Sequence, residues 1–213
     1  MHTDSADCFD ALAADVLWRT FTAEERLRVD AFVRCWGIKP GDRVLEPGCG
    51  SGRLTEVLAE LTGPTGRVVA FDCSPEFLRL AVQRKLPSHV TLHAARAEEL
   101  RLVPGSFDHV VCFNVFPHLV PQAAIARRLV EMLRPGGAFW IAHTCSRGVV
   151  NAVHRRGAAA FHEHILPDPR KLARLLREAG LKDVEIEDGA RHFLARAVRH
   201  LPESAILNDV NHV

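Results

Sequence analysis

The chain has 213 residues, 47% of them apolar, and a formal net charge of +1 at pH 7. This length and apolar content suit one domain with a substantial core, and the balanced charge argues against nucleic-acid binding. No apolar run approaches the ~18 residues of a membrane helix, and the amino-terminal segment lacks a signal-peptide pattern. Six cysteines without a CxxC pair are typical of reduced thiols. We therefore expect a cytoplasmic domain that binds neither nucleic acid nor membranes.

Helices and strands are predicted to alternate along the chain. Apolar residues at helical spacing between residues 6 and 36 predict two short helices. Further helices are expected at 53–62, 75–85, 121–134 and 168–180, and strands at 43–47, 67–71, 90–93, 107–113, 137–143, 183–187 and 192–198. This alternation favours an α/β fold with a doubly wound, mostly parallel sheet and helices on both faces. Ligands of such sheets bind outside the carboxyl ends of the strands.

A glycine-rich loop within residues 44–55 joins the first predicted strand to a helix. Gly48, Gly50 and Gly52 form a GxGxG pattern, in which bare backbone can approach a ligand closely. The spacing matches neither the GxGxxG dinucleotide motif nor a phosphate loop that ends in Gly-Lys-Ser/Thr. Glu46 precedes the loop and would repel a pyrophosphate. The pattern therefore favours a ligand that carries positive charge.

A second carboxylate, that of Asp72, stands at the end of the next predicted strand. An acid about 20 residues beyond a glycine loop is the usual group that binds the hydroxyls of a ribose. Together with Glu46, it predicts a nucleoside ligand with a cationic group. A nucleotide-binding loop of another kind is the alternative.

These features and two later motifs resemble the class I S-adenosylmethionine-dependent methyltransferases. Residues 105–114 resemble the fourth strand of that family, and residues 133–141 resemble its turn into the fifth strand. The motifs span about residues 40–143, and the later pattern extends to about residue 198. The resemblance implies a Rossmann-like fold with a seven-stranded sheet and S-adenosylmethionine as the cofactor.

The resemblance also divides the single methyltransferase domain, residues 1–213, into four parts. These are an amino-terminal helical lid at 1–36, a cofactor-binding core at 37–143, an acceptor-side insert at 144–167, and a carboxyl-terminal helix and strands at 168–200. The apolar residues of the first part could equally be ordinary core or the surface of a homodimer.

Ten residues are assigned to the cofactor site by the resemblance. The loop would hold the methionine end, and Asp72 the ribose hydroxyls. Glu98 would contact adenine or be a solvated helix residue; where the family often carries an acid, this chain has Arg96, so backbone amides around Ala97 could serve instead. The cysteines of the set are interpreted as small packing residues. The predicted cofactor-binding residues are Glu46, Gly48, Cys49, Gly50, Gly52, Asp72, Cys73, Ala97, Glu98 and Asn114.

Five residues are candidates for the acceptor side of the site. His118 follows the fourth predicted strand and His143 ends the fifth, so both fall at strand carboxyl ends, and either could act as a base. If residues 148–156 are helical, Arg147, Asn151 and His154 share one helix face. The alternative is a helix whose polar side faces solvent.

No bound metal is predicted, although histidines are frequent around the insert. His162 and His164 form an HxH pair, and a strand would place both on one side. Combined with His118, His143 or His154 they would satisfy metal-ligand chemistry, but the spacing does not specify such a site.

The expected activity is methyl transfer to an oxygen, nitrogen or sulfur atom of a small molecule. Displacement at a sulfonium depends mainly on positioning and desolvation, and a base is needed only where the acceptor arrives protonated. Three arginines near the insert, Arg147, Arg155 and Arg156, hint at an acceptor with a carboxylate or phosphate. The alternatives are a protein or RNA methyltransferase and a non-catalytic cofactor-binding protein. The sequence at residues 114–117 departs from the Asn/Asp-Pro-Pro-Tyr/Phe motif of base-modifying amino methyltransferases.

Overall fold

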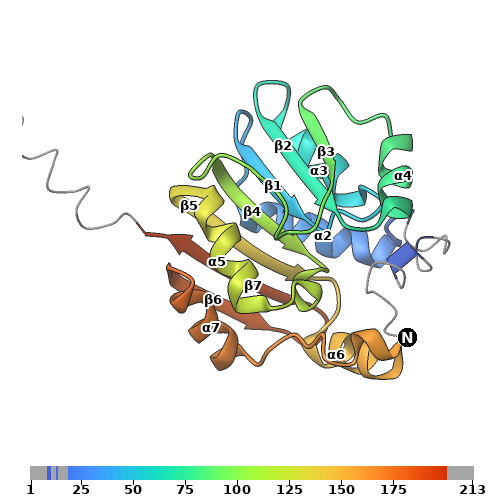
Figure 1. Ribbon diagram of the computed structural model, residues 1–213, viewed down its shortest axis with the longest axis vertical. Coiled ribbons are helices and arrows are strands. Elements are labelled where there is room, and N and C mark those ends of the chain that lie inside the picture. Colours follow the sequence, from blue (N-terminus) through green and yellow to red (C-terminus); the bar gives the residue numbers. More distant parts are fainter. Residues whose placement is uncertain (1–8, 11–12, 14–18, 201–213) are drawn as a thin grey trace, which may run out of the picture.

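The computed structural model describes residues 9–10, 13 and 19–200, and Figure 1 shows a central sheet with helices on both sides. The helices are α2 (Ala23–Trp36), α3 (Arg53–Thr62), α4 (Pro75–Gln83), α5 (Gln122–Met132), α6 (Arg147–Arg156) and α7 (Pro169–Glu178), with 3-10 turns η2 (Phe116–His118) and η3 (Ala159–Phe161). The strands are β1 (Arg43–Pro47), β2 (Arg67–Asp72), β3 (Val90–Ala94), β4 (Phe107–Phe113), β5 (Leu133–His143), β6 (Leu181–Asp188) and β7 (Phe193–Arg199).

The seven strands form one sheet in the order β3-β2-β1-β4-β5-β7-β6. The first five in this order run parallel, and β7 pairs antiparallel with both β5 and β6. The α/β fold with a mostly parallel seven-stranded sheet is thereby confirmed. The first of the two helices expected before the sheet falls mostly outside the described residues.

Both faces of the sheet are buried, as its alternating side chains show. On β1, Val44 packs into the cluster beneath α2 and α3, and Leu45 packs into the cluster beneath α5 and α7. On β4, Val111 packs into the first of these clusters and Val110 into the second. Because successive strand residues point to opposite faces, a strand that is apolar throughout requires helices on both sides. The carboxyl ends of the parallel strands are thus the edge at which a ligand can reach polar groups.

The junction between α5 and β5 differs from the prediction of a helix at 121–134 and a strand at 137–143. The helix ends at Met132, and Leu133 already adopts an extended backbone conformation. Pro135 disfavours helical geometry in the residue before it. Leu133 is fully buried and pairs with Phe107, so the strand begins there and regains a regular register only at Ala138.

Two helices near the strand ends begin at serine caps. The Ser74 side chain accepts a hydrogen bond from the Phe77 amide at the start of α4, and the Ser146 side chain caps α6 in the same way. The conditional helix at 148–156 is therefore present, one residue longer at its start. In the described part of the chain, no helix is long and apolar enough to cross a membrane.

Candidate active site

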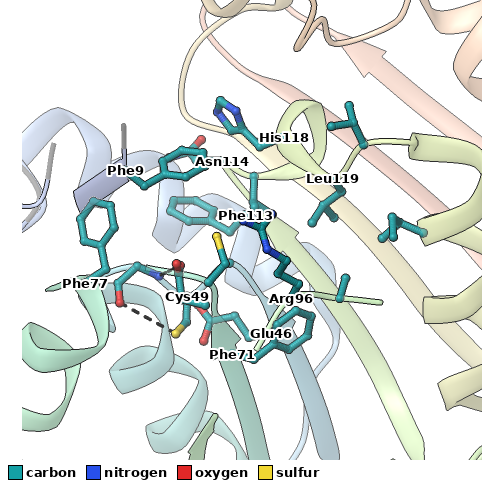
Figure 2. Close-up of a pocket in the computed structure, with 18 of the residues that line it drawn as sticks. Phe9, Glu46, Cys49, Phe71, Phe77, Arg96, Phe113, Asn114, His118 and Leu119 are labelled. Atoms are coloured by element: carbon teal, nitrogen blue, oxygen red, sulfur yellow. Dashed lines mark hydrogen bonds between the residues drawn. The ribbon is translucent and has the colours of Figure 1, made fainter. Parts of the chain in front are cut away.

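A cavity of about 520 Å³ lies at the carboxyl ends of the parallel strands. Figure 2 shows His118 and Phe9 on one side of this cavity and Glu46 and Phe71 on the other. Its lining comes from the glycine loop, the ends of β1, β2 and β4, the segment 95–98, and the turns around η2 and η3. The volume falls within the ~300–1,000 Å³ typical of small-molecule sites.

The glycine loop adopts a conformation that requires glycine. Gly48, Gly50 and Gly52 have φ angles of +62°, +53° and +78°, in the left-handed region. A Cβ atom on Gly48 would lie 2.2 Å from Cγ2 of Val115, in the segment after β4. The Cys49 amide donates to the Phe71 carbonyl at 3.0 Å and so holds the loop against the end of β2. The backbone of this loop is thereby fixed along one wall of the cavity.

Asp72 connects the end of β2 to the glycine loop. Its Oδ2 accepts a hydrogen bond from the Gly50 amide at 2.8 Å, and its Oδ1 accepts one from the Ser74 amide at 2.9 Å. Burial raises the pKa of Asp72, and backbone hydrogen bonds from Ser74, Gly50 and Cys73 oppose that rise. The carboxylate lines the cavity as an acceptor group, which fits the hydroxyls of a ribose.

Glu46 is almost completely buried at the base of the cavity, with 2% of its surface exposed. Thr55 donates its hydroxyl to Oε2 at 2.6 Å. Burial raises the pKa of Glu46 to about 8, the Thr55 hydrogen bond lowers it, and the charge of Asp72 raises it further. A cationic ligand beside this carboxyl would favour its ionised form. The site therefore fits a positively charged ligand, as the sequence pattern indicates.

Cys49 and Cys73 both line the cavity. Burial raises the pKa of the Cys49 thiol well above its usual value, and the neighbouring acids Glu46 and Asp72 add to the rise. A thiol held in its neutral form is a poor nucleophile. This geometry agrees with the interpretation of Cys49 as a packing residue.

The segment 95–98 forms the wall that the resemblance assigns to adenine. Ala97 is buried, and Glu98 is exposed at the edge of the cavity. Arg128 donates to the carbonyl oxygens of Ala97 at 2.8 Å and Leu100 at 2.6 Å. The Ala95 amide donates to the Asp72 carbonyl and the Arg96 amide donates to the Glu99 side chain, each at 3.1 Å, so the amides of Ala97 and Glu98 are the ones available to a ligand. Arg128 could not be recognised from the sequence, because an arginine on a predicted helix usually faces solvent.

Asn114 lies where β4 ends and adopts a left-handed conformation with a φ of +53°. Asparagine tolerates this conformation better than most residues. Its Oδ1 accepts from the Thr144 amide at 3.1 Å, and its Nδ2 donates to the Thr144 hydroxyl at 3.4 Å. Asn114 thus ties the end of β4 to the end of β5 while it lines the cavity.

His118 lines the cavity at the end opposite Glu46. Its Nδ1 lies 2.9 Å from Nδ1 of His164, and the rings of Phe9 and Phe161 contact its ring edge-on, at centroid distances of 5.0 Å and 5.2 Å. Burial and then the charges of three neighbouring histidines hold the pKa of His118 well below its usual value. The imidazole is therefore neutral at physiological pH and can accept a proton.

His154, on the last turn of α6, also lines the cavity. Its ring centroid lies 4.6 Å from that of His118, and its Nδ1 contacts the carbonyl oxygen of His164. Because a carbonyl only accepts, this Nδ1 carries the proton. The structure thus brings together two of the five residues expected on the acceptor side.

His143 is not among the cavity-lining residues, contrary to the expectation from its place at the end of β5. Its side chain is 2% exposed, lies edge-on to Phe193, and leaves Nε2 without a hydrogen-bond partner among the described residues. Burial and then His154 lower its pKa to about 3. The strand ends with this side chain turned into the core, so a direct role as base does not fit the geometry.

Arg147 and Asn151 also lie away from the cavity. The Arg147 Nε donates to Asp188 at 2.7 Å. Asn151 is buried and makes two hydrogen bonds with the backbone of Leu166, to its carbonyl at 3.0 Å and from its amide at 2.8 Å. The shared face of α6 therefore packs on the following segment and on the end of β6, and only the last turn of the helix reaches the cavity. Both side chains act in the fold rather than at the acceptor.

The HxH pair does not behave as a strand pair. His162 is exposed and contacts the Gly157 carbonyl at 3.2 Å, whereas His164 is 7% exposed and contacts His118. The two side chains diverge because this segment is a turn after η3. Among the described residues, no group of three His, Cys, Asp or Glu side chains is placed to hold a metal ion.

The parallel sheet, the glycine loop and the acid at the end of β2 define the class of α/β proteins that bind a nucleoside at the strand ends. A family model described as a methyltransferase domain matches residues 44–137. A ubiquinone biosynthesis O-methyltransferase of Burkholderia pseudomallei is 33% identical over 170 residues, which cover 74% of this chain and 72% of that protein. A protein with the same name from Xanthomonas axonopodis pv. citri is 32% identical over 199 residues, which cover 85% of this chain and 81% of the relative.

A similar fold occurs in the N-methyltransferase NodS of Bradyrhizobium japonicum, solved in complex with S-adenosyl-L-homocysteine. The TM-score is 0.72 at 22% identity, over 92% of this chain and 99% of NodS. The matched methyltransferase domain and the two relatives described above show that the chain belongs to the class I S-adenosylmethionine-dependent methyltransferases.

Proposed function

We propose that this methyltransferase acts on a hydroxyl group of a small molecule. The observation that carries the proposal is the apolar cavity that runs from Glu46 and the glycine loop to His118 and His154. A neutral histidine at the far end of the cavity suits an acceptor that arrives protonated. The similarity to proteins named ubiquinone biosynthesis O-methyltransferase supports oxygen as the accepting atom.

The residues on the donor side fit S-adenosylmethionine, which supplies an electrophilic methyl group on a sulfonium. The glycine loop would lie along its methionine end, Asp72 would hold the ribose hydroxyls, and Glu46 would stabilise its positive charge. Residues 95–98 would border the adenine. The orientation of the Asp72 carboxylate, the buried carboxyl of Glu46 and the fixed backbone of the loop support these roles.

On the acceptor side, His118 would accept the hydroxyl proton through Nε2, since its Nδ1 is engaged by His164. Phe9, Phe113 and Phe161 border the same space and would exclude water from the displacement. Phe9 and Phe21 belong to the expected amino-terminal lid, whose other apolar residues, Leu12, Leu17 and Trp18, lie outside the described residues. Phe9 lines the cavity, and Phe21 contacts the cavity-lining Phe113 with a ring centroid distance of 6.0 Å, and both contacts support the lid as a proposal.

The three arginines near the insert do not support an acidic acceptor. Arg147 pairs with Asp188, and Arg155 and Arg156 are exposed at the end of α6 and do not line the cavity. A protein or RNA acceptor would also have to present its nucleophile through a cavity walled by aromatic rings. We therefore favour a small molecule.

A methyl-transfer assay with labelled S-adenosylmethionine tests the proposal. The acceptors are a panel of catechols, phenols, amines and thiols, together with a transfer RNA and a mixed peptide pool. We expect label in a hydroxylated small molecule and release of S-adenosylhomocysteine. Label in the RNA or peptides alone would replace the proposal with the macromolecular alternative. Binding of S-adenosylhomocysteine with no labelled product in any class would favour a non-catalytic role.

A further inference from the structure

His118 contacts two other histidines, His154 and His164, and its contact with His164 joins a ring nitrogen to a ring nitrogen. His118 and His164 are 46 positions apart in the sequence, and their Nδ1 atoms lie 2.9 Å from each other. At this distance one Nδ1 donates a proton and the other accepts it. The two neutral imidazoles therefore share one proton between their Nδ1 atoms. The position of that proton decides whether Nε2 of His118 is protonated.

Two tautomers satisfy the contact, and they give His118 opposite properties. If His118 Nδ1 carries the shared proton, its Nε2 is unprotonated and can accept a proton. If His164 Nδ1 carries it, His118 Nε2 is protonated and can only donate. Only the first arrangement can remove a proton from a hydroxyl.

The surroundings of the pair favour positive charge on His164 over positive charge on His118. His118 is enclosed by the aromatic rings of Phe9 and Phe161, and it faces His154 on α6 and the buried His143 on β5. Burial and then His154 lower the pKa of His164 as well, but the charge of the adjacent Glu163 opposes this lowering, and no such acid opposes that of His118. A cation formed during turnover is therefore better placed on His164, further from the positively charged methyl donor.

We propose that His164 is a positioning residue for methyl transfer: it accepts the Nδ1 proton of His118 and keeps Nε2 of His118 open to take the acceptor's proton. The inference rests on the proposed function for its role in turnover, whereas the tautomer of His118 in the free protein does not depend on it.

In this proposal, two proton transfers along the histidine pair accompany methyl transfer. The acceptor O–H bond breaks and its proton goes to His118 Nε2, while the Nδ1 proton of His118 passes to His164 Nδ1, which becomes an imidazolium. The acceptor oxygen forms a bond to the methyl carbon, and the carbon–sulfur bond breaks with its electron pair left on sulfur. When the product leaves, the shared proton returns to His118 Nδ1, and water removes the proton from Nε2.

Nitrogen NMR of the histidine rings tests the tautomer without any acceptor. In protein with ¹⁵N-labelled histidine, we expect His118 to be protonated at Nδ1 and unprotonated at Nε2 near pH 7, with its signal assigned from a His118→Asn variant. His164→Ala removes the acceptor and should move His118 to the Nε2-protonated form. His164→Asn offers a carbonyl oxygen at the same place and should retain the wild-type tautomer. An Nε2-protonated His118 in the wild-type protein would overturn the proposal.

Kinetics with a series of substituted phenols tests the role in turnover. With a weakly acidic phenol, His164→Ala should lower kcat by ~10- to 100-fold, a part of the 10²–10⁴ that general bases contribute. The loss should shrink as the phenols become more acidic, and His164→Asn should recover only part of the rate. Combined with His118→Asn, His164→Ala should cost nothing further.

The matched control is His162→Ala, which removes an exposed histidine of the same turn that does not contact His118. Its kcat should equal that of the wild type, and all variants should bind S-adenosylhomocysteine with unchanged affinity. An equal loss in both alanine variants, or a loss in His164→Ala that is independent of phenol acidity, would assign His164 a structural role only. If the wild type methylates no phenol, the proposed function fails, while the NMR result still decides the tautomer.

Discussion

Replacement of Asp72 by alanine tests the donor half of the site most sharply. The carboxylate is 8% exposed and lines the cavity, and it accepts backbone hydrogen bonds at 2.8 Å from Gly50 and at 2.9 Å from Ser74. These bonds fix the orientation in which the carboxylate would accept from a ribose hydroxyl. Loss of a charge-assisted hydrogen bond to a ligand costs about 1.5–3 kcal/mol. At ~1.4 kcal/mol per tenfold, this corresponds to ~10- to 150-fold weaker binding.

Titration calorimetry with S-adenosylhomocysteine measures this loss directly. Asp72→Asn is the companion variant, because it retains one acceptor oxygen and should lose less affinity than Asp72→Ala. Asp188→Ala is the control, since Asp188 is also an acid at a strand end but pairs with Arg147 away from the cavity. Asp72→Ala binding as tightly as wild type would refute the assignment of this carboxylate to the ribose.

Three further outcomes are expected. Gly48→Ala should lower the melting temperature and abolish S-adenosylhomocysteine binding, because the new Cβ would lie 2.2 Å from Val115 Cγ2 and the backbone φ is +62°. The additional substitution Val115→Ala should recover part of the stability. Burial raises the pKa of Glu46 from 4.5 to about 8, so the folded state retains a proton that the unfolded state loses. Stability of the ligand-free protein, measured by urea unfolding, should therefore fall between about pH 5 and pH 8, and Glu46→Gln should remove that fall. As the pH rises over the same range, Glu46 becomes ionised, so binding of S-adenosylmethionine should strengthen more than binding of S-adenosylhomocysteine, which lacks the sulfonium charge. Equal pH dependence of the two affinities would count against recognition of the sulfonium by Glu46. Arg147→Ala should leave kcat/KM unchanged and cost at most ~1 kcal/mol of stability, as partly exposed ion pairs do; a large loss of activity would return this arginine to the acceptor site.

The sheet and the glycine loop were predictable because their signals are local. Strands with near-continuous apolar runs alternate with helices, and Gly48, Gly50 and Gly52 stand between two strand-end acids. These patterns place the loop at the carboxyl edge without knowledge of any distant contact. The end of α5 was misjudged by two residues, since the buried pairing of Leu133 with Phe107 outweighs the helical pattern.

The acceptor side was less predictable because its contacts join distant segments. His118 and His164 meet across 46 residues, and the sequence offers His164 only as half of an HxH pair. The orientation of His143 could not be inferred from its place at a strand end, because β5 is buried on both faces and either direction leads into apolar surroundings. Asn151 resembles a ligand-binding amide in sequence, yet its two hydrogen bonds are made with the backbone of Leu166.

The central claim is that one cavity joins the methyl donor to the hydroxyl of a small molecule at His118. Mass spectrometry of reactions with S-adenosylmethionine and a panel of catechols and phenols tests this most directly, with wild type and His118→Asn side by side. The account predicts an O-methylated product and an equal amount of S-adenosylhomocysteine in the wild type, and a ~10²-fold or greater loss in the variant. A wild type that binds S-adenosylhomocysteine but methylates none of these compounds, or a variant as fast as the wild type, would contradict it.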